Sequence, residues 1–102
     1  MKIVIEKQKI TDYLLVWKQK NDKSKFLNDL GYSLQNWEEL KDDIEKIVLE
    51  NQRIFQNAAP FGGNLYQVNG NLRNFGVITI WLLAENNDTF RFVTLYPDKK
   101  NL

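Results

Sequence analysis

The chain of 102 residues has the size of one domain, residues 1–102, and is long enough to bury a core without disulfides or metal. It holds no cysteine and no histidine, which excludes thiolate chemistry, Cys-type zinc sites and imidazole acid/base catalysis. Its net charge of +1 at pH 7 argues neither for nor against nucleic acid as a partner.

The first residues, MKIVIEKQK, are charged where a secretory signal peptide has its apolar segment. No apolar run approaches the roughly 18 residues that a membrane-spanning helix needs. We therefore expect a cytoplasmic protein that contacts no membrane. Any catalysis would rest on carboxylates, Lys, Arg, Tyr, Thr or Ser, and the sequence shows no metal cluster and no cofactor motif.

The charges are unevenly distributed along the chain. Residues 1–26 hold seven Lys against three acids, a local charge of +4, and residues 27–50 hold two Lys against seven acids, a local charge of −5. Residues 51–102 hold five bases against three acids, a local charge of +2. A mixed, solvated surface is the simpler interpretation of this pattern, and one positive face is the alternative.

The N-terminal third predicts a short strand followed by short helices. KIVI, residues 2–5, is β-branched and suits an edge strand. In residues 10–17, Thr11 is placed to cap a short helix that carries Tyr13, Leu14 and Trp17 at helical spacing. A polar loop follows over residues 18–24, and residues 25–32 predict one or two helical turns that end at Gly31.

The clearest element is an amphipathic helix over residues 33–51, with Ser33 as its N-cap. Its apolar side chains recur at three- and four-residue steps: Leu34, Trp37, Leu40, Ile44, Ile47 and Val48. Acidic residues occupy the opposite face, several of them near the N-terminus, where the helix dipole favours negative charge. A helix of this kind is expected to pack on a flat partner.

The C-terminal half predicts that partner, a β-meander. After a loop over residues 57–63, residues 64–72 predict a strand that carries Leu65 on one side and Tyr66 and Val68 on the other. Asn69-Gly70 suits a tight turn or a bulge, so this strand could be broken there. Asn74 begins a second turn.

Two further strands follow. GVITIWLLA, residues 76–84, predicts a central strand buried on both faces. After a hairpin loop over residues 85–88, TFRFVTLYP returns antiparallel and is closed by Pro97. Strict alternation places Phe90, Phe92, Thr94 and Tyr96 on one face and Arg91, Val93 and Leu95 on the other. The predicted fold is α+β, with N-terminal helices packed on one face of a C-terminal antiparallel sheet of three to four strands.

Four linked motifs occur in a fixed order along this chain. The residues that carry them are Lys23 or Lys25, then Phe26, Gly31, Tyr32, Trp37, Leu40, Pro60, Phe61, Gly62, Trp81, Thr94, Tyr96 and Pro97. In this order they resemble the uncharacterised bacterial family named domain of unknown function 6883, over about residues 8–97. The resemblance implies a domain type and no particular activity.

A looser resemblance points to an activity. A terminal T-x-Y-P strand after helices and a meander is similar to small metal-independent ribonuclease toxins of the barnase, EndoU, colicin and RelE-like class. That resemblance implies RNA lying across an antiparallel sheet and a ribose 2′-OH activated against the adjacent phosphate. Many such enzymes use histidine, which this chain lacks, whereas RelE-like members work through Lys, Arg and Tyr.

Cleavage of this kind needs a base for the 2′-OH, positive charge on the phosphate and a proton for the leaving oxygen. The catalytic candidates are Lys25, Arg91, Thr94 and Tyr96, and the substrate-binding candidates are Lys23, Arg73 and Phe61. Each has a structural alternative: an exposed lysine, a solvent-facing strand residue, an aromatic at the rim of the sheet that packs on the helix, or a hydrophobic side chain that packs within its loop. The three tryptophans, Trp17, Trp37 and Trp81, are at core spacing and are interpreted as packing residues.

The candidate residues also set two geometric conditions. Arg91 lies on the predicted strand face opposite Thr94 and Tyr96, so it joins them only if the sheet twists strongly or a bulge intervenes. A catalytic cleft further requires the amphipathic helix to leave the concave side of a curled sheet at least partly uncovered.

The leading hypothesis is a toxin-like, metal-independent endoribonuclease without a cofactor, from a toxin–antitoxin or related bacterial system. Its expected partners are RNA and a cognate antitoxin or immunity protein. The alternative is a non-enzymatic interaction module, an antitoxin or accessory protein that recognises a partner through its sheet edge. The choice between Lys23 and Lys25, and the oligomeric state, stay open at this point.

Overall fold

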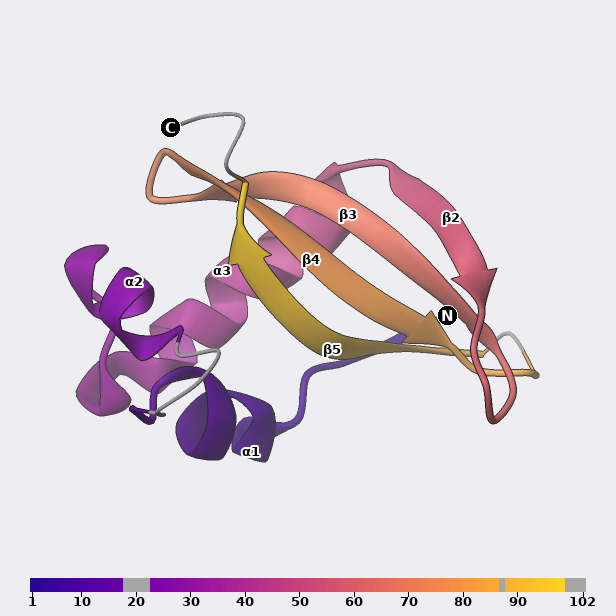
Figure 1. Ribbon diagram of the computed structural model, residues 1–102, viewed down its shortest axis with the longest axis horizontal. Helices are drawn as coiled ribbons and strands as arrows, with labels where there is room; N and C mark the ends of the chain where they lie inside the picture. Colours follow the sequence, from indigo (N-terminus) through magenta and orange to yellow (C-terminus); the bar gives the residue numbers. More distant parts are fainter. Residues whose placement is uncertain (18–22, 87, 99–102) are drawn as a thin grey trace.

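Helices lie on one side of a five-stranded mixed sheet in a computed structural model that describes residues 1–17, 23–86 and 88–98 (Figure 1). The strands are β1 (Lys2–Val4), β2 (Arg53–Ala58), β3 (Asn64–Leu72), β4 (Phe75–Leu83) and β5 (Thr89–Pro97), in the order β1-β5-β4-β3-β2. The helices are α1 (Lys7–Lys9), the π-helical turn η1 (Ile10–Leu14), α2 (Ser24–Asp29), the 3-10 turn η2 (Leu34–Asn36) and α3 (Trp37–Glu50). The α+β class is confirmed.

The sheet differs from the prediction in two respects. It has five strands and is mixed, because β1 pairs parallel to β5 while the other pairings are antiparallel. The unpredicted strand is β2, an edge strand whose residues are almost all exposed, so it carries no alternation of buried and exposed side chains that could announce it. Its pairing with β3 is what makes it a strand.

The first helix begins earlier than predicted. Glu6 occupies the N-cap position of α1, and Thr11 lies inside the following turn, where its hydroxyl donates to the Lys7 carbonyl (3.2 Å). The helical turn ends at Leu14, so the spacing that linked Tyr13, Leu14 and Trp17 does not continue to the tryptophan. Trp17 is consequently 72% exposed and is not a core residue. The predicted polar loop falls largely on residues 18–22, outside the described part of the chain.

The predicted helix end at Gly31 is confirmed, whereas the long helix α3 begins at Trp37, with Asn36 and not Ser33 as its N-cap. Gly31 follows α2 with φ of 95°, a backbone conformation in the left-handed region that favours glycine. Ser33 caps η2 in a capping box, in which its backbone N–H donates to the Asn36 side-chain oxygen at 2.6 Å. Of the predicted apolar stripe, Leu34 is exposed, whereas Leu40, Ile44, Ile47 and Val48 are buried.

Strand β3 runs unbroken through Asn69-Gly70. Gly70 is needed for packing, since a Cβ there would lie 2.7 Å from the Ile47 side chain of α3. The turn comes later, at Arg73 and Asn74, which both have positive φ and join β3 to β4 in a two-residue hairpin. The other predicted hairpin loop, residues 85–88, includes Asn87, which lies outside the described residues.

The core lies between α3, the N-terminal helical segments and one face of the sheet. Trp81 is its largest member, stacked on Phe90 at 5.4 Å and edge-on to Phe92 at 5.4 Å. The one polar side chain buried beside it is satisfied, because Thr79 donates to the Val68 carbonyl (2.7 Å) and accepts from the Trp81 indole (2.8 Å). In the described part of the chain, no helix has the length and apolar character needed to cross a membrane.

Candidate active site

A bulge in β5 decides which side chains share a face. Thr94 pairs with Ile80, but Phe92 pairs with the next residue, Trp81, so Val93 is the extra residue. Partners across an antiparallel pair point to the same side, which places Thr94, Tyr96 and Arg91 together opposite Ile80, Ile78 and Leu82.

The strict alternation predicted for β5 is therefore wrong beyond Phe92. The buried residues of β5 are Phe90, Phe92 and Leu95, and the bulge is the physical reason for the change of phase. Arg91 and Thr94 become successive positions on one face, about 7 Å apart along the strand. The condition that the sequence set for Arg91 is met.

Three polar side chains from distant parts of the chain meet at this bulge. The Lys23 ammonium donates to the Thr94 hydroxyl at 2.6 Å and to the Tyr13 hydroxyl at 3.1 Å. The two hydroxyls lie 3.4 Å apart, and either can donate to the other. We call these three residues the Tyr13 cluster. It is partly buried, in contrast to the exposed polar contacts found on much of the surface.

Each member of the cluster is held by a different element. Tyr13 lies in η1, Lys23 is the residue that precedes α2, and Thr94 lies in β5 one residue after the bulge. Beyond the short pairing with β1, the free edge of β5 is where the N-terminal helical segments lie (Figure 1). The cluster therefore depends on tertiary packing and on the bulge together.

The surroundings of Tyr13 are cationic. Lys23 lies 5.1 Å from the centre of its ring and Lys9 lies 5.8 Å from it. The hydrogen bond with Thr94 is the largest influence on the phenol and lowers its pKa, and the hydrogen bond from Lys23 lowers it further. Partial burial opposes them without reversing the direction. A phenol in this setting gives up its proton more readily than an ordinary tyrosine.

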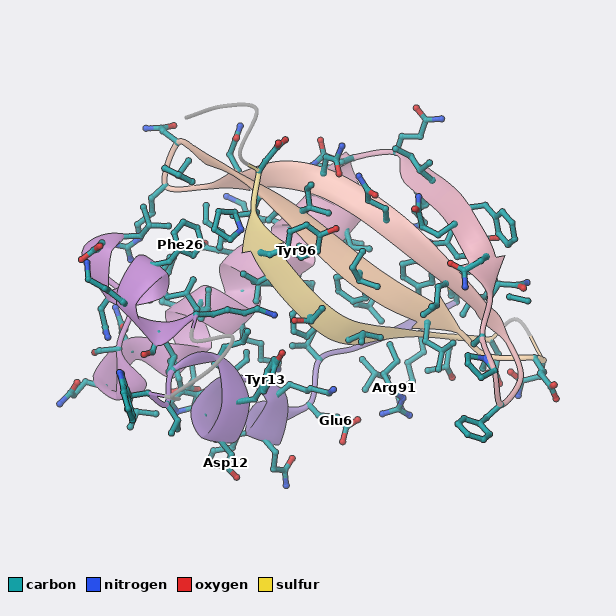
Figure 2. The ribbon with its side chains drawn as sticks, in the orientation of Figure 1. Glu6, Asp12, Tyr13, Phe26, Arg91 and Tyr96 are labelled. Atoms are coloured by element: carbon teal, nitrogen blue, oxygen red, sulfur yellow. The ribbon has the colours of Figure 1, made fainter. Side chains whose placement is uncertain are left out.

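Arg91 and Glu6 lie next to the cluster along β5. The Arg91 guanidinium donates to the Glu6 carboxylate at 2.6 Å, with both side chains a little under half exposed. Figure 2 shows Tyr13, Glu6 and Arg91 along the same border of the molecule, beside β5. A phosphate that reaches this guanidinium must compete with the Glu6 carboxylate for it.

Of the other predicted site residues, Lys25 and Phe61 lie away from this cluster, whereas Tyr96 is close to it along β5. Lys25 is on the exposed face of α2, where it pairs with Asp29 at 3.5 Å. Phe61 is fully exposed at the loop between β2 and β3. Tyr96 is on the same face of β5 as Thr94 and is 39% exposed. Of the two lysines between which the sequence left a choice, Lys23 is the one that meets Tyr13 and Thr94.

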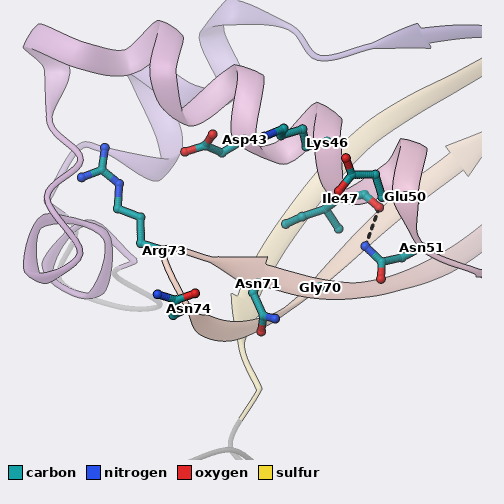
Figure 3. A pocket seen from close by; sticks show the side chains of 9 residues that line it. All are labelled: Asp43, Lys46, Ile47, Glu50, Asn51, Gly70, Asn71, Arg73 and Asn74. Carbon is teal, nitrogen blue, oxygen red and sulfur yellow. Dashed lines mark hydrogen bonds between the residues drawn. The ribbon is translucent and has the colours of Figure 1, made fainter.

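Arg73 belongs to a separate region. Its guanidinium donates to Glu39 and lies 4.4 Å from the centre of the Tyr32 ring. It lines one end of a groove of about 510 Å³ between α3 and the end of β3, shown in Figure 3. The carboxylates Asp43 and Glu50 line this groove together with Lys46, so its two cations are balanced by two anions and it has no net attraction for a phosphate.

Apart from the groove at the end of β3, the face of the sheet that packs against α3 is closed at its centre. Val68, Thr79, Trp81 and Phe92 are fully buried there, so the side of the sheet that was expected to stay partly uncovered is closed. Across residues 1–17, 23–86 and 88–98, no group of three or more acids could hold a metal ion.

Sequence reasoning selected Lys23, Thr94 and Arg91 but missed Tyr13 and Glu6. Tyr13 was interpreted as one of several apolar residues at helical spacing, and nothing in its own segment distinguishes it. Tyr13 and Thr94 are far apart in the sequence, and only the fold brings their hydroxyls together. The sequence of either segment alone therefore gave no signal for Tyr13.

Comparison with known proteins identifies a family and no individual relative. The chain belongs to the family described as Domain of unknown function (DUF6883), whose model matches residues 1–99. No curated protein and no solved structure matches the chain. Family membership therefore agrees with the linked motifs and leaves the activity to be argued from the site.

Proposed function

We propose that this chain is a toxin-like, metal-independent endoribonuclease whose catalytic centre is the Tyr13 cluster. The observation that carries the proposal is a tyrosine hydroxyl with a lowered pKa, held by the Lys23 ammonium and the Thr94 hydroxyl. These groups match what ribose-assisted cleavage needs in a chain without histidine: a base, positive charge and a proton donor.

In this mechanism the Tyr13 phenolate takes the proton of a ribose 2′-OH. The 2′ oxygen then forms a bond to the adjacent phosphorus while the bond from phosphorus to the 5′ oxygen breaks, giving a 2′,3′-cyclic phosphate. The Lys23 ammonium stabilises the charge that develops on the phosphate and gives a proton to the leaving 5′ oxygen. Arg91, the next side chain before Thr94 on the same face of β5, holds the flanking phosphate through its planar guanidinium.

The two lysines that flank Ser24 provide a matched experiment. Purified wild-type protein, Lys23→Met and Lys25→Met are incubated with total RNA in EDTA, and the new ends are analysed for cyclic phosphate. We expect cleavage by wild-type protein that survives EDTA, unchanged cleavage by Lys25→Met, and a loss of about 100-fold or more in Lys23→Met. Preparing the three proteins in parallel controls for contaminating nuclease.

Two outcomes would contradict the proposal. One is an absence of cleavage by folded wild-type protein over a range of pH values. The other is equal cleavage by Lys23→Met, which would assign the activity to another site or to a contaminant. Growth arrest on expression, relieved by an adjacent gene, would add support for a toxin with a cognate antitoxin or immunity protein.

The rival proposal is a non-enzymatic interaction module, and one observation favours it. Strand β2 is an edge strand that exposes Ile54 (41%) and Phe55 (56%), which suits pairing with an extended segment of a partner. Harmless high-level expression with no RNA degradation would select this function over the ribonuclease. Loss of partner binding in Phe55→Lys, with cleavage never observed, would complete that case.

A further inference from the structure

The side chain of Glu6 does not cap its own helix. Glu6 occupies the N-cap position of α1, where Ser, Thr, Asp and Asn are the residues whose side chains best satisfy the first backbone N–H groups. The glutamate makes no such hydrogen bond, and its carboxylate accepts from the Arg91 guanidinium at 2.6 Å instead. Its negative charge is therefore directed to a residue of the candidate active site.

The parallel pairing of β1 with β5 keeps this carboxylate in place. Val4 is the partner of Arg91 in that pairing, and Glu6 follows two residues later. Ile5, between them, is buried in the core, and α1 begins directly after Glu6. The backbone is thus held on both sides of Glu6, so a negative charge lies next to Arg91 in the protein without a ligand. Figure 2 shows Glu6 between Tyr13 and Arg91 along the border of the molecule.

The ion pair between Arg91 and Glu6 is of a kind that exchanges readily. Both side chains are a little under half exposed, so solvent screens the pair and its contribution to stability is small. A phosphate offers the guanidinium two oxygens in a planar, bidentate contact and can replace the carboxylate. A carboxylate and a phosphate on the same guanidinium would repel each other, so one of them has to leave.

The pair therefore lowers the affinity of Arg91 for any phosphate, because only the fraction of molecules in which Glu6 has moved away can bind it. In the proposed reaction, no bond forms or breaks at the flanking phosphate that Arg91 holds. Its contact with Arg91 is consequently of similar strength before and during cleavage. Displacing Glu6 should change how tightly RNA and its products bind, and not the rate of the chemical step.

We propose that Glu6 is an internal competitor for the phosphate site at Arg91. Its carboxylate occupies the guanidinium in the free protein, is displaced when a phosphate binds and returns when the product leaves. The contact inhibits binding and promotes the release of the cleaved chain, a step that limits turnover in many enzymes. The identity of the anion as an RNA phosphate rests on the proposed ribonuclease function, whereas the competition itself can be measured without cleavage.

The binding of inorganic phosphate tests the competition directly. The arginine Nε–Hε NMR signals of wild-type protein, Glu6→Gln and Glu38→Gln are followed as phosphate is added, and Arg91→Gln identifies the signal of Arg91. Glu38 is an exposed acid in the first turn of α3, so Glu38→Gln is a control with the same change in net charge. We expect the dissociation constant of phosphate at Arg91 to fall about three- to fivefold in Glu6→Gln, the range of one exposed ion pair, and to stay unchanged in Glu38→Gln.

A double-variant cycle tests whether Glu6 acts through Arg91. The probe is a labelled RNA whose 2′-OH groups are methylated, so that it binds without being cleaved. Glu6→Gln should tighten its binding about three- to fivefold in the presence of Arg91 and leave it unchanged in the Arg91→Gln background. In cleavage assays the KM of Glu6→Gln should fall by the same factor, and its kcat should not rise.

Three results would overturn the inference. Phosphate and the methylated RNA could bind Glu6→Gln no more tightly than wild-type protein, or Glu38→Gln could tighten their binding equally. Weaker binding in Glu6→Gln would show instead that Glu6 orients Arg91 for the phosphate. The proposed ribonuclease function fails separately, since binding that tightens in Glu6→Gln while wild-type protein cleaves no RNA would leave the anion site and remove the activity.

Discussion

Two tyrosines from the N-terminal half have hydroxyls that meet charged side chains, and the two settings have opposite consequences. The Tyr32 hydroxyl donates to the Asp43 carboxylate at 2.6 Å, and burial, helped by that carboxylate, raises the pKa of Tyr32 to about 12. The Tyr13 hydroxyl meets Thr94 and the Lys23 ammonium instead, and its pKa is lowered. The same side chain is therefore fixed as a proton donor in one region and prepared to lose its proton in the other.

The difference separates a structural cluster from a candidate catalytic one. The Tyr32 region, with Asp43, Arg73 and Glu39, links α3 to the turn between β3 and β4 and satisfies its charges internally. The Tyr13 cluster instead brings the Lys23 ammonium and the Thr94 hydroxyl to the phenol, with Lys9 near its ring. A base that works near neutral pH needs the second arrangement.

The same substitution in the two regions should give the largest difference between them. Tyr13→Phe removes the proposed base and should lower the rate of RNA cleavage by about 100- to 10,000-fold. Tyr32→Phe should leave the rate close to that of wild-type protein. Initial rates on a labelled RNA, with far-ultraviolet circular dichroism to confirm folding, provide the measurement. Equal losses in the two variants would show that Tyr13 has no special part in cleavage.

The pH dependence of the cleavage rate should also distinguish Tyr13 from an ordinary tyrosine. If the Tyr13 phenolate is the base, cleavage should rise by up to about tenfold per pH unit and level off above its lowered pKa. Thr94→Val removes the hydrogen bond that contributes most to the lowering, so the plateau should move to higher pH. Tyr13→Phe, measured in the same buffers, gives the background hydrolysis to subtract. A flat profile in wild-type protein would exclude a titrating phenol.

The smallest expected effect is on stability in the Tyr32 region. Tyr32→Phe removes a hydrogen bond to a charged group and should lower the free energy of unfolding by about 1–2 kcal/mol near neutral pH, measured by urea denaturation. Because the folded pKa is raised, the stabilisation is present below pH 10 and is lost as the pH rises from 10 through about 12. Tyr32→Phe should lack this alkaline loss, and its persistence would assign the loss to another group.

The sequence predicted most of the secondary structure because periodic apolar patterns report burial directly. The amphipathic stripe of α3 and the strands around Trp81 belong to this class. Strand β2 does not, because an exposed edge strand owes its conformation to the neighbour with which it pairs. Trp17 shows the converse error, since apolar spacing across the end of a helical turn no longer describes one face.

What the sequence determined by itself was the class of the fold, the family and a set of residue types that limits any chemistry to Lys, Arg, Tyr, Thr, Ser and carboxylates. Only the tertiary structure decided between Lys23 and Lys25, because two residues along the chain separate an interior contact from an exposed one. The bulge at Val93 likewise moved Thr94 to the face of Arg91, and a one-residue shift in a strand reverses every side chain that follows it. The register between two strands depends on both of them, so it cannot be predicted from the sequence of one strand alone.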